Sequence, residues 1–198
     1  MKKTFFELSL LLGLCFSLLT SALALEHQKD ISEKLIRLHI VANSNSESDQ
    51  ETKLLVRDGI TEYMKALTLN CRSAEEARDL ISSHLKEFED IANNICKQRN
   101  AGYLSRAELG NSTFPTKRYN VLTLPAGEYE SLNIYLGSGS GENWWCVLFP
   151  PLCISAAETK DSLKSANLSN KEIKYITADE ATYQFEFKLL EIIQKLKI

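Results

Sequence analysis

The segment from Asn143 to Cys153, with the sequence NWWCVLFPPLC, constrains the fold more than any other part of the chain. Successive side chains of a strand point to opposite faces, so Trp144 and Trp145 cannot enter the same core if residues 144–149 are extended. The Pro-Pro pair that follows has no backbone N–H groups and should end the strand or place it at a sheet edge. Two interpretations stay open: a core strand with a rigid exit, or a hairpin that adds to a docking surface, because exposed aromatic residues often anchor interfaces.

Alternation of apolar and polar residues predicts strands elsewhere, and apolar stripes at helical spacing predict helices. The expected strands are residues 35–42, 103–109, 116–124, 128–137 and 144–149, with a weaker one at 173–176. The expected helices are residues 48–67, 73–97 and 177–196, opened by the capping boxes Ser48 with Glu51, Ser73 with Glu76 and Thr177 with Glu180. Turn residues lie at 110–112, 125–127 and 137–141. We therefore expect an α+β fold in which a helical hairpin and a C-terminal helix pack on a mainly antiparallel sheet.

Residues 1–24 are typical of a signal peptide. A pair of lysines precedes an apolar stretch at 8–19, and Ala22-Leu23-Ala24 forms a small-x-small site, with cleavage expected after Ala24. A retained anchor is the alternative, because the apolar run is close to the length that spans a bilayer. In a chain of 198 residues, the remainder, 25–198, is expected to form a single α+β domain.

Charge and cysteine content exclude some partners and leave others open. The net charge of −3 provides no basic field for nucleic acid. In an exported chain, the four cysteines beyond Cys15 could form disulfides, and the local pairings Cys71–Cys96 and Cys146–Cys153 are the first to test. Their spacing does not resemble a metal knuckle, and we expect neither a metal nor a cofactor.

Candidate catalytic residues are few. A Cys146–His39 nucleophile pair is conceivable, because such groups meet in space rather than in sequence, but no local signature supports it. Residues 137–141 lack both the end of a phosphate-binding loop and the serine of a nucleophile elbow. The polar residues between Arg37 and Asp58 have two interpretations: turn and cap formers that satisfy backbone amides, or a recognition surface.

Four groups of residues carry a resemblance to a known family. They are IRLHIVANS at 36–44 with Asp49-Gln50 and Val56-Arg57-Asp58; FPTK at 114–117; PAGEY at 125–129; and NWWCVLFPPLC. Together they resemble the stage II sporulation protein R family of endospore-forming bacteria, and the last group is the most specific. The chain departs from the family at Asn45, where aspartate is frequent, and at Ile154-Ser155, where an aromatic and an acidic residue are usual.

The resemblance implies a secreted signal that is not an enzyme. Such a protein would be made in the forespore and exported across the forespore membrane into the space between forespore and mother cell. There it would trigger a membrane-embedded aspartic protease, the sigma-E processing peptidase, which matures pro-sigma-E in the mother cell. The resemblance implies no small-molecule substrate, and membrane association would come only from the partner or from a retained N-terminus.

We hypothesise that one surface binds the outward side of this protease and favours its active, dimeric state. The expected partner-binding residues are Arg37, His39, Asn43, Ser44, Asp49, Gln50, Asn143, Trp144 and Trp145. Two competing functions are an exported thiol hydrolase using Cys146 and His39, and a cell-envelope module that stacks glycans on the tryptophans.

Overall fold

The structure is a computed structural model that describes the backbone of residues 2–119, 122–152, 163–164 and 166–177, and within these the side chains of all but 2–3 and 17–24. The helices are α1 (Lys2–Ser32), α2 (Glu47–Leu67), α3 (Ala74–Ser83), α4 (Leu85–Gln98) and α6 (Asn170–Thr177). The strands are β1 (Ile36–Val41), β2 (Ser105–Phe114), β3 (Lys117–Arg118), β4 (Thr123–Leu124), β5 (Gly127–Leu136) and β6 (Asn143–Phe149). The expected C-terminal helix lies outside the described residues beyond Thr177, the proposed first residue of its capping box, which is itself the last residue of α6.

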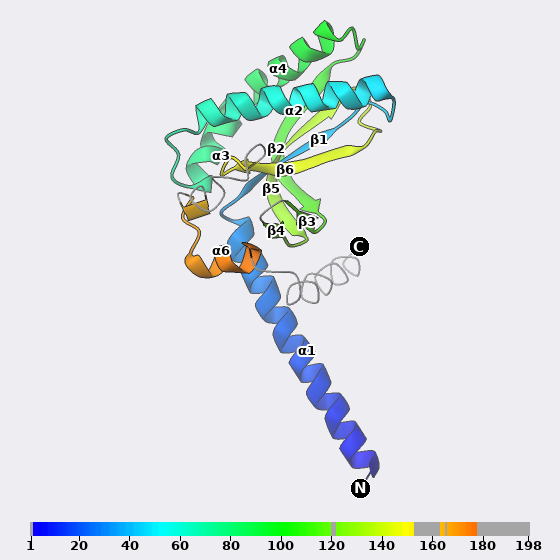
Figure 1. The fold of residues 1–198 in the computed structure, drawn as a ribbon, viewed down its shortest axis with the longest axis vertical. Helices are drawn as coiled ribbons and strands as arrows, with labels where there is room; N and C mark the ends of the chain where they lie inside the picture. Colours follow the sequence, from blue (N-terminus) through cyan, green and yellow to red (C-terminus); the bar gives the residue numbers. More distant parts are fainter. Residues whose placement is uncertain (1, 120–121, 153–162, 165, 178–198) are drawn as a thin grey trace.

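A four-stranded sheet in the order β2-β5-β1-β6 forms the centre of the fold. The central pair β1 and β5 is parallel, whereas β2 with β5 and β1 with β6 are antiparallel. Helices α2 and α4 lie over one face of this sheet, and α1 projects away from the opposite end of the body (Figure 1). The expected α+β fold with a mainly antiparallel sheet is therefore confirmed.

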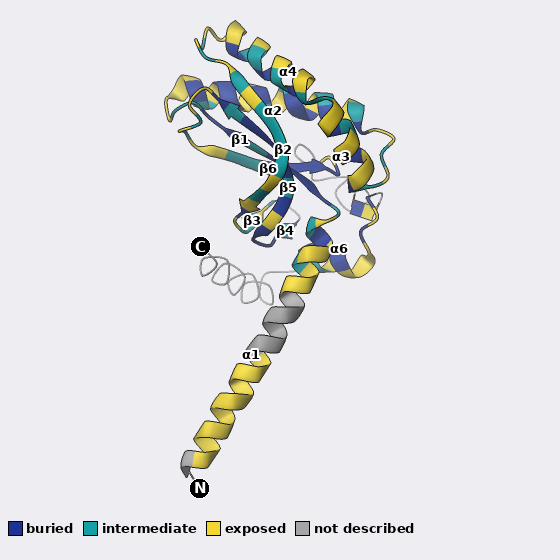
Figure 2. Cartoon of the chain, turned by 180° about the vertical axis from the view of Figure 1, so that it is seen from behind, coloured by how far each residue is buried: buried dark blue, intermediate teal, exposed yellow. Residues whose placement is uncertain are grey.

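The alternation of β1 explains which face the helices cover. Leu38 and Ile40 are fully buried on the face toward α2, beside their sheet neighbours Leu132 and Ile134. Arg37 and His39 point to the other face, where Phe114, Tyr129 and the short β3–β4 hairpin pack. Figure 2 shows that the buried residues concentrate on the strands and on the helix faces turned toward them.

The capping box before α3 is confirmed, whereas the predicted Ser48–Glu51 box does not open α2, because that helix is capped two residues earlier. Ser73 accepts a hydrogen bond from the backbone N–H of Glu76, whose carboxylate accepts from the N–H of Arg72. At α2 the cap is Ser46, which accepts from the N–H of Asp49. The carboxylate of Asp49, in the first turn of α2, belongs to the hydrogen-bond network described below.

The predicted helix 73–97 is interrupted at His84, which separates α3 from α4. His84 leaves helical geometry at φ −117° and ψ 22°. Its ring nitrogen Nδ1 lies 2.8 Å from the carbonyl oxygen of Leu80. In a continuous helix this oxygen would accept from the backbone N–H of His84, which instead donates to Ile81. The break lets α4 turn so that Phe88 and Ala92 are buried.

One turn prediction and two strand predictions are wrong. The expected turn at 110–112 is the middle of β2, which pairs with β5 without a register shift from Ser105 to Phe114. The expected strand at 116–124 is a hairpin of two short strands, β3 and β4. The weak strand at 173–176 belongs to helix α6, whose first turn has a capping box formed by Ser169 and Glu172.

The C-terminal end of α1 is part of the folded body. Ile31 is fully buried, and Gln28 donates a hydrogen bond to the carbonyl oxygen of Glu128 at the start of β5. Lys34, just after the helix, forms an ion pair of 2.7 Å with the buried Glu172 of α6. The N-terminal half of α1 exposes large apolar side chains, including Phe5, Leu10 and Phe16. Among the helices described, none has the combined length and apolarity needed to span a bilayer.

Candidate functional site

The polar residues between β1 and α2 form a closed network around Asp49. One carboxylate oxygen accepts hydrogen bonds from Asn43 at 2.9 Å and Ser44 at 2.5 Å, and the other accepts from the hydroxyl of Tyr103 at 2.7 Å. Burial alone would raise the pKa of Asp49, but the hydrogen bonds from Ser44, Tyr103 and Asn43 outweigh it and lower the pKa to about 2. Asp49 is therefore ionised at neutral pH and holds three chain segments together.

The same network fixes the loop between β5 and β6. The side-chain oxygen of Asn43 accepts from the backbone N–H of Ser138, and the buried Lys53 donates to both Gln50 and the carbonyl oxygen of Glu142. A Cβ at Gly137 or Gly141 would collide with Asn43 or Ser44, which explains the glycines of this loop. The hydrogen bonds of this network are all intramolecular and give a structural role to four of the predicted partner-binding residues, Asn43, Ser44, Asp49 and Gln50.

The two tryptophans lie on opposite faces of the sheet, as the alternation of a strand predicts. The ring of Trp145 stacks on His39 with centroids 3.8 Å apart and an interplanar angle of 7°, and its edge contacts Phe114 at 4.7 Å. The ring of Trp144 lies on the α2 side, with the guanidinium of Arg57 4.5 Å from its centroid. The expectation of a single surface that contains both rings is therefore wrong.

His39, Tyr135, Asn143 and Trp145 form a part-exposed group on the face opposite α2, which we call the His39 patch. The ring of Tyr135 meets His39 edge-on at 6.1 Å, and Nε2 of His39 lies 2.7 Å from Oδ1 of Asn143. Nδ1 of His39 lies 3.2 Å from Oδ1 of the buried Asn133. In the patch, Trp145 and His39 are thus stacked face to face, Tyr135 stands edge-on to His39, and amide side chains contact both nitrogens of the imidazole.

Burial lowers the pKa of His39 below its ordinary value of 6.5, although the hydrogen bonds to Asn143 and Asn133 oppose this effect. The imidazole is therefore neutral at pH 7. The four residues of the patch are then uncharged, with Asn143 exposed at its rim. The exposed Arg106, which forms an ion pair with Glu108, borders the patch, and its guanidinium lies 4.7 Å from the ring centroid of Tyr135.

Arg37 does not belong to this surface, because it is fully buried. Its guanidinium lies 4.0 Å from the ring centroid of Phe114 and 4.9 Å from that of Tyr129, and it donates to the hydroxyl of Tyr119 at 2.6 Å. Burial lowers the pKa of Arg37, opposed by Tyr119 and Tyr129, yet an arginine stays protonated at any ordinary pH. The prediction that Arg37 contacts a partner is contradicted. Its position supports a structural role beneath the β3–β4 hairpin.

The cysteine predictions have different outcomes. Cys71 and Cys96 are free thiols, so their predicted pairing is wrong. Cys71 follows the C-terminal end of α2, whereas Cys96 lies near Asp49 at the other end of that helix, and a helix of this length spans about 30 Å. Cys146 is disulfide-bonded, and its predicted partner, Cys153, lies outside the described residues.

The Cys146–His39 nucleophile pair does not form. In the register of β1 and β6, Cys146 is opposite Leu38, and Trp145 is opposite His39, so the sulfur and the imidazole lie on different faces of the sheet. A cysteine in a disulfide also supplies no thiolate. The exported thiol hydrolase loses its proposed nucleophile.

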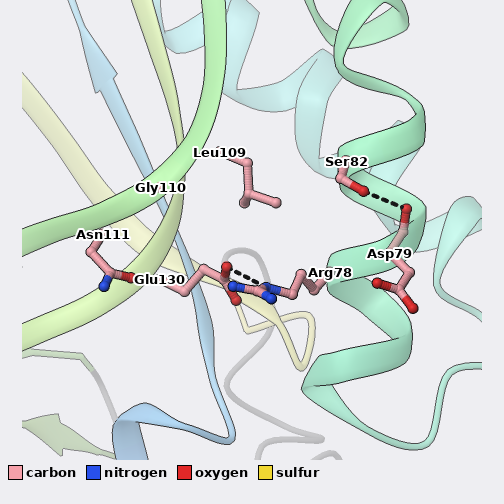
Figure 3. Close-up of a pocket in the computed structure, with 7 residues that line it drawn as sticks. All are labelled: Arg78, Asp79, Ser82, Leu109, Gly110, Asn111 and Glu130. Atoms are coloured by element: carbon pink, nitrogen blue, oxygen red, sulfur yellow. Dashed lines mark hydrogen bonds and ion pairs between the residues drawn. The ribbon is translucent and has the colours of Figure 1, made fainter.

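A polar pocket of about 370 Å³ opens between α3 and the outer strand β2 (Figure 3). Its lining residues are Arg78, Asp79, Ser82, Leu109, Gly110, Asn111 and Glu130. These residues match no sequence motif, and the sequence of residues 110–112 is typical of a turn. In the described part of the chain, no cluster of acidic residues, histidines or cysteines could hold a metal ion.

Comparison with known proteins places these features in a family. The sequence model of the stage II sporulation protein R family matches residues 32–159. Stage II sporulation protein R of Bacillus subtilis (strain 168) is 38% identical over 155 residues, which cover 75% of this chain and 69% of that protein. No solved structure matches the chain. The interval matched by the family includes both the Asp49 network and the His39 patch, and the chain belongs to the stage II sporulation protein R family.

Proposed function

We propose that this chain is an exported sporulation signal that activates the membrane-embedded sigma-E processing peptidase and so triggers maturation of pro-sigma-E in the mother cell. Membership of the family establishes a role in sporulation. The signal-like residues 1–24 support export. The proposed site of action is the space between the forespore and mother-cell membranes.

The observation that carries this proposal is the His39 patch. Trp145 and His39 form a preorganised stack that stays partly exposed, at a part of the sheet that α2 and α4 do not cover. Large rigid aromatic side chains lose little conformational freedom on binding, and they dominate the energetics of many interfaces. The patch therefore has the composition of a protein-docking site, with Asn143 as a polar group at its rim.

Activation requires more than binding. A ligand shifts a conformational equilibrium only by its difference in affinity for the two states. We propose that the His39 patch binds the outward side of the peptidase more tightly in its active, dimeric state than in its inactive state. The separation of Cys146 from His39 on opposite sheet faces argues against the competing thiol hydrolase, which requires this pair.

The adjacent tryptophans provide a matched test. Replacing Trp145→Ala removes the exposed ring, and we expect pro-sigma-E processing in sporulating cells to slow by at least about tenfold, the effect of losing a central interface aromatic. Trp144→Ala removes a ring of similar size from the α2 side and should leave processing near the wild-type rate. Both variants are compared at equal exported protein level, with processing followed by immunoblot.

The control is the thermal unfolding midpoint of each purified variant. Loss of processing by Trp145→Ala supports docking through the His39 patch when this variant unfolds at a midpoint no lower than that of Trp144→Ala. Wild-type processing by a folded Trp145→Ala protein would remove the His39 patch from the proposal. Unchanged processing when all of the patch residues are replaced would remove docking through this sheet face altogether.

A further inference from the structure

Strand β2 is an outer strand of the sheet, and its free edge has two different halves. In an antiparallel ladder, alternate residues turn both N–H and C=O away from the partner strand. The N–H of Ser105 binds the side-chain oxygen of Asn93 at 2.7 Å, and that of Ala107 binds the carboxylate of Glu89 at 3.1 Å. Helix α4 thus covers the outward groups of the first half.

The second half of this edge is open. By the same alternation, Leu109, Asn111 and Thr113 turn their N–H and C=O groups outward, and in the described part of the chain no partner binds them. Natural sheets usually protect such an edge with a bulge, a proline, a lysine or a covering element. Here the register runs on without a shift, and residues 109–113 include neither proline nor any charged residue.

The pocket of Figure 3 lies beside this open half, between it and α3. Arg78 forms an ion pair with Glu130 across the pocket, and Asp79 and Glu75 also act on its charge. The pocket lining therefore carries two carboxylates, those of Asp79 and Glu130, and one guanidinium, which gives an excess of one negative charge. The hydroxyl of Ser82 donates to the backbone oxygen of Asp79 (Figure 3), and Asp79 also lines the pocket. A basic side chain complements this charge.

We propose that the open edge of β2 at residues 109–113 binds an extended segment of a partner polypeptide as an added antiparallel strand, with a lysine or arginine opposite Asn111 that reaches into the acidic pocket. Side chains of directly opposite residues share a sheet face, so a residue opposite Asn111 faces α3, as Asn111 and Leu109 do. This inference goes beyond the proposed function, because it requires neither the His39 patch nor the sigma-E processing peptidase.

A second copy of the chain fits this edge less well than a basic partner strand. Symmetric pairing of two β2 strands would place Asn111 opposite Asn111 and bring no basic side chain to either pocket. It would also bring together two pockets that each carry an excess of carboxylates, which repel. The charge of the site thus favours a different, basic polypeptide.

The probe is the acetylated and amidated pentapeptide Thr-Val-Lys-Val-Thr, added to the full chain purified in mild detergent. We expect amide hydrogen exchange to slow at residues 109–113 when the peptide binds. A peptide with glutamate in place of lysine should bind about threefold to tenfold more weakly, because the charge pair is solvent-accessible. Asp79→Asn should reduce the affinity for the lysine peptide by about threefold and leave the affinity for the glutamate peptide no weaker.

N-methylated peptides test the added strand without changing the protein. A methyl on the lysine nitrogen removes the N–H that faces Asn111, and binding should fall by at least about tenfold. A methyl on the next valine removes an N–H that faces solvent, and binding should persist. Equal binding of the two methylated peptides would overturn strand addition, and equal binding of the lysine and glutamate peptides would overturn the charge assignment.

The matched protein variants are Asn111→Pro and Asn111→Ala. Proline is tolerated on an edge strand where the N–H faces solvent, so Asn111→Pro should fold but lose peptide binding, whereas Asn111→Ala should keep it. Circular dichroism checks the fold of both. If the full chain instead sediments as a dimer that Asn111→Pro dissociates, and the peptide causes no protection, then the occupant is a second copy and the proposal is wrong.

Discussion

At the scale of single residues, Asp49 has the clearest energetic consequence. Its pKa is lowered from 3.8 to about 2 in the folded state, so its contribution to stability is present above pH 3.8 and is lost as the pH falls through about 2. The shift corresponds to about 2 kcal/mol. We predict that Asp49→Asn lowers the free energy of unfolding by about that amount at pH 7.

The measurement for Asp49 is urea unfolding at pH 7 and at pH 2.5. The difference between wild type and Asp49→Asn should shrink at the lower pH, since the wild-type carboxylate is then partly protonated. A difference that is independent of pH would contradict the role of ionised Asp49 in joining Asn43, Ser44 and Tyr103. Replacing the exposed Glu47 by glutamine at the start of the same helix serves as the control.

His39 is predicted to be neutral in the folded protein, whereas a histidine that gains a carboxylate partner on folding is usually protonated. Burial lowers its pKa below 6.5, so its folded form disfavours the proton, and stability is lost as the pH falls from 6.5 through that lowered value. We predict that a proton NMR titration of the His39 ring has its midpoint below 6.5, and that His39→Gln removes this part of the pH dependence of unfolding. A midpoint above 6.5 would show that the stack on Trp145 stabilises the imidazolium more than burial opposes it.

Residue roles were the least predictable part of the site. The sequence gives no reason to assign different roles to Arg37, His39 and Asp49, which are all expected to bind the partner. In the structure Arg37 is a buried cation, Asp49 is a carboxylate that joins loops, and His39 is part of a partly exposed aromatic stack. Their partners Tyr119, Tyr103 and Trp145 lie far away in sequence. No local pattern encodes such contacts.

At the scale of elements, the sequence predicts those helix and strand ends that neighbouring residues determine. The Ser73 capping box and the end of β6 before the Pro-Pro pair are both confirmed. The Gly110-Asn111-Ser112 turn is wrong because the ladder between β2 and β5 overrides the weak local preference of these residues. The Ser169–Glu172 capping box was a local signal that could have identified α6.

The attachment of α6 to the end of α1 is predicted to depend on one buried ion pair. Glu172 is 8% exposed at its side chain, and its partner Lys34 is 34% exposed. Burial would raise the pKa of Glu172, but Lys34 and Ser169 lower it overall. We expect Lys34→Met and Glu172→Met each to cost about 1–3 kcal/mol, because each leaves the other charge unpaired or removes the cap.

A double-mutant cycle measures this coupling. The variant with both methionines should be less destabilised than the sum of the two single variants by about 1 kcal/mol or more, because no uncompensated charge remains. Urea unfolding of all four proteins gives the comparison. Strictly additive effects would show that the ion pair does not couple the two helices.

At the scale of the whole molecule, the sheet separates three surfaces with different uses. One face is closed by α2 and α4, the other carries the His39 patch, and the outer edge at β2 carries the acidic pocket (Figures 1 and 3). The β1–α2 loop, anchored by Asp49, closes the sheet at one end, while α1 and α6 meet at the other. The two proposed docking surfaces, the His39 patch and the open edge of β2, therefore share no residue.

The N-terminal helix is predicted to contain a dispensable and an indispensable part. Burial against the body begins near Gln28 and is complete at Ile31, which lies beyond the expected cleavage after Ala24. A chain beginning at residue 25 should therefore unfold at the same urea concentration as the full chain. A chain beginning at residue 35 loses the buried Ile31 side chain and the partner of Glu172, and it should be less stable by about 3–5 kcal/mol. Equal stability of the two shortened chains would contradict the attachment of α1, whereas destabilisation of both would show that the segment before Ala24 belongs to the folded unit.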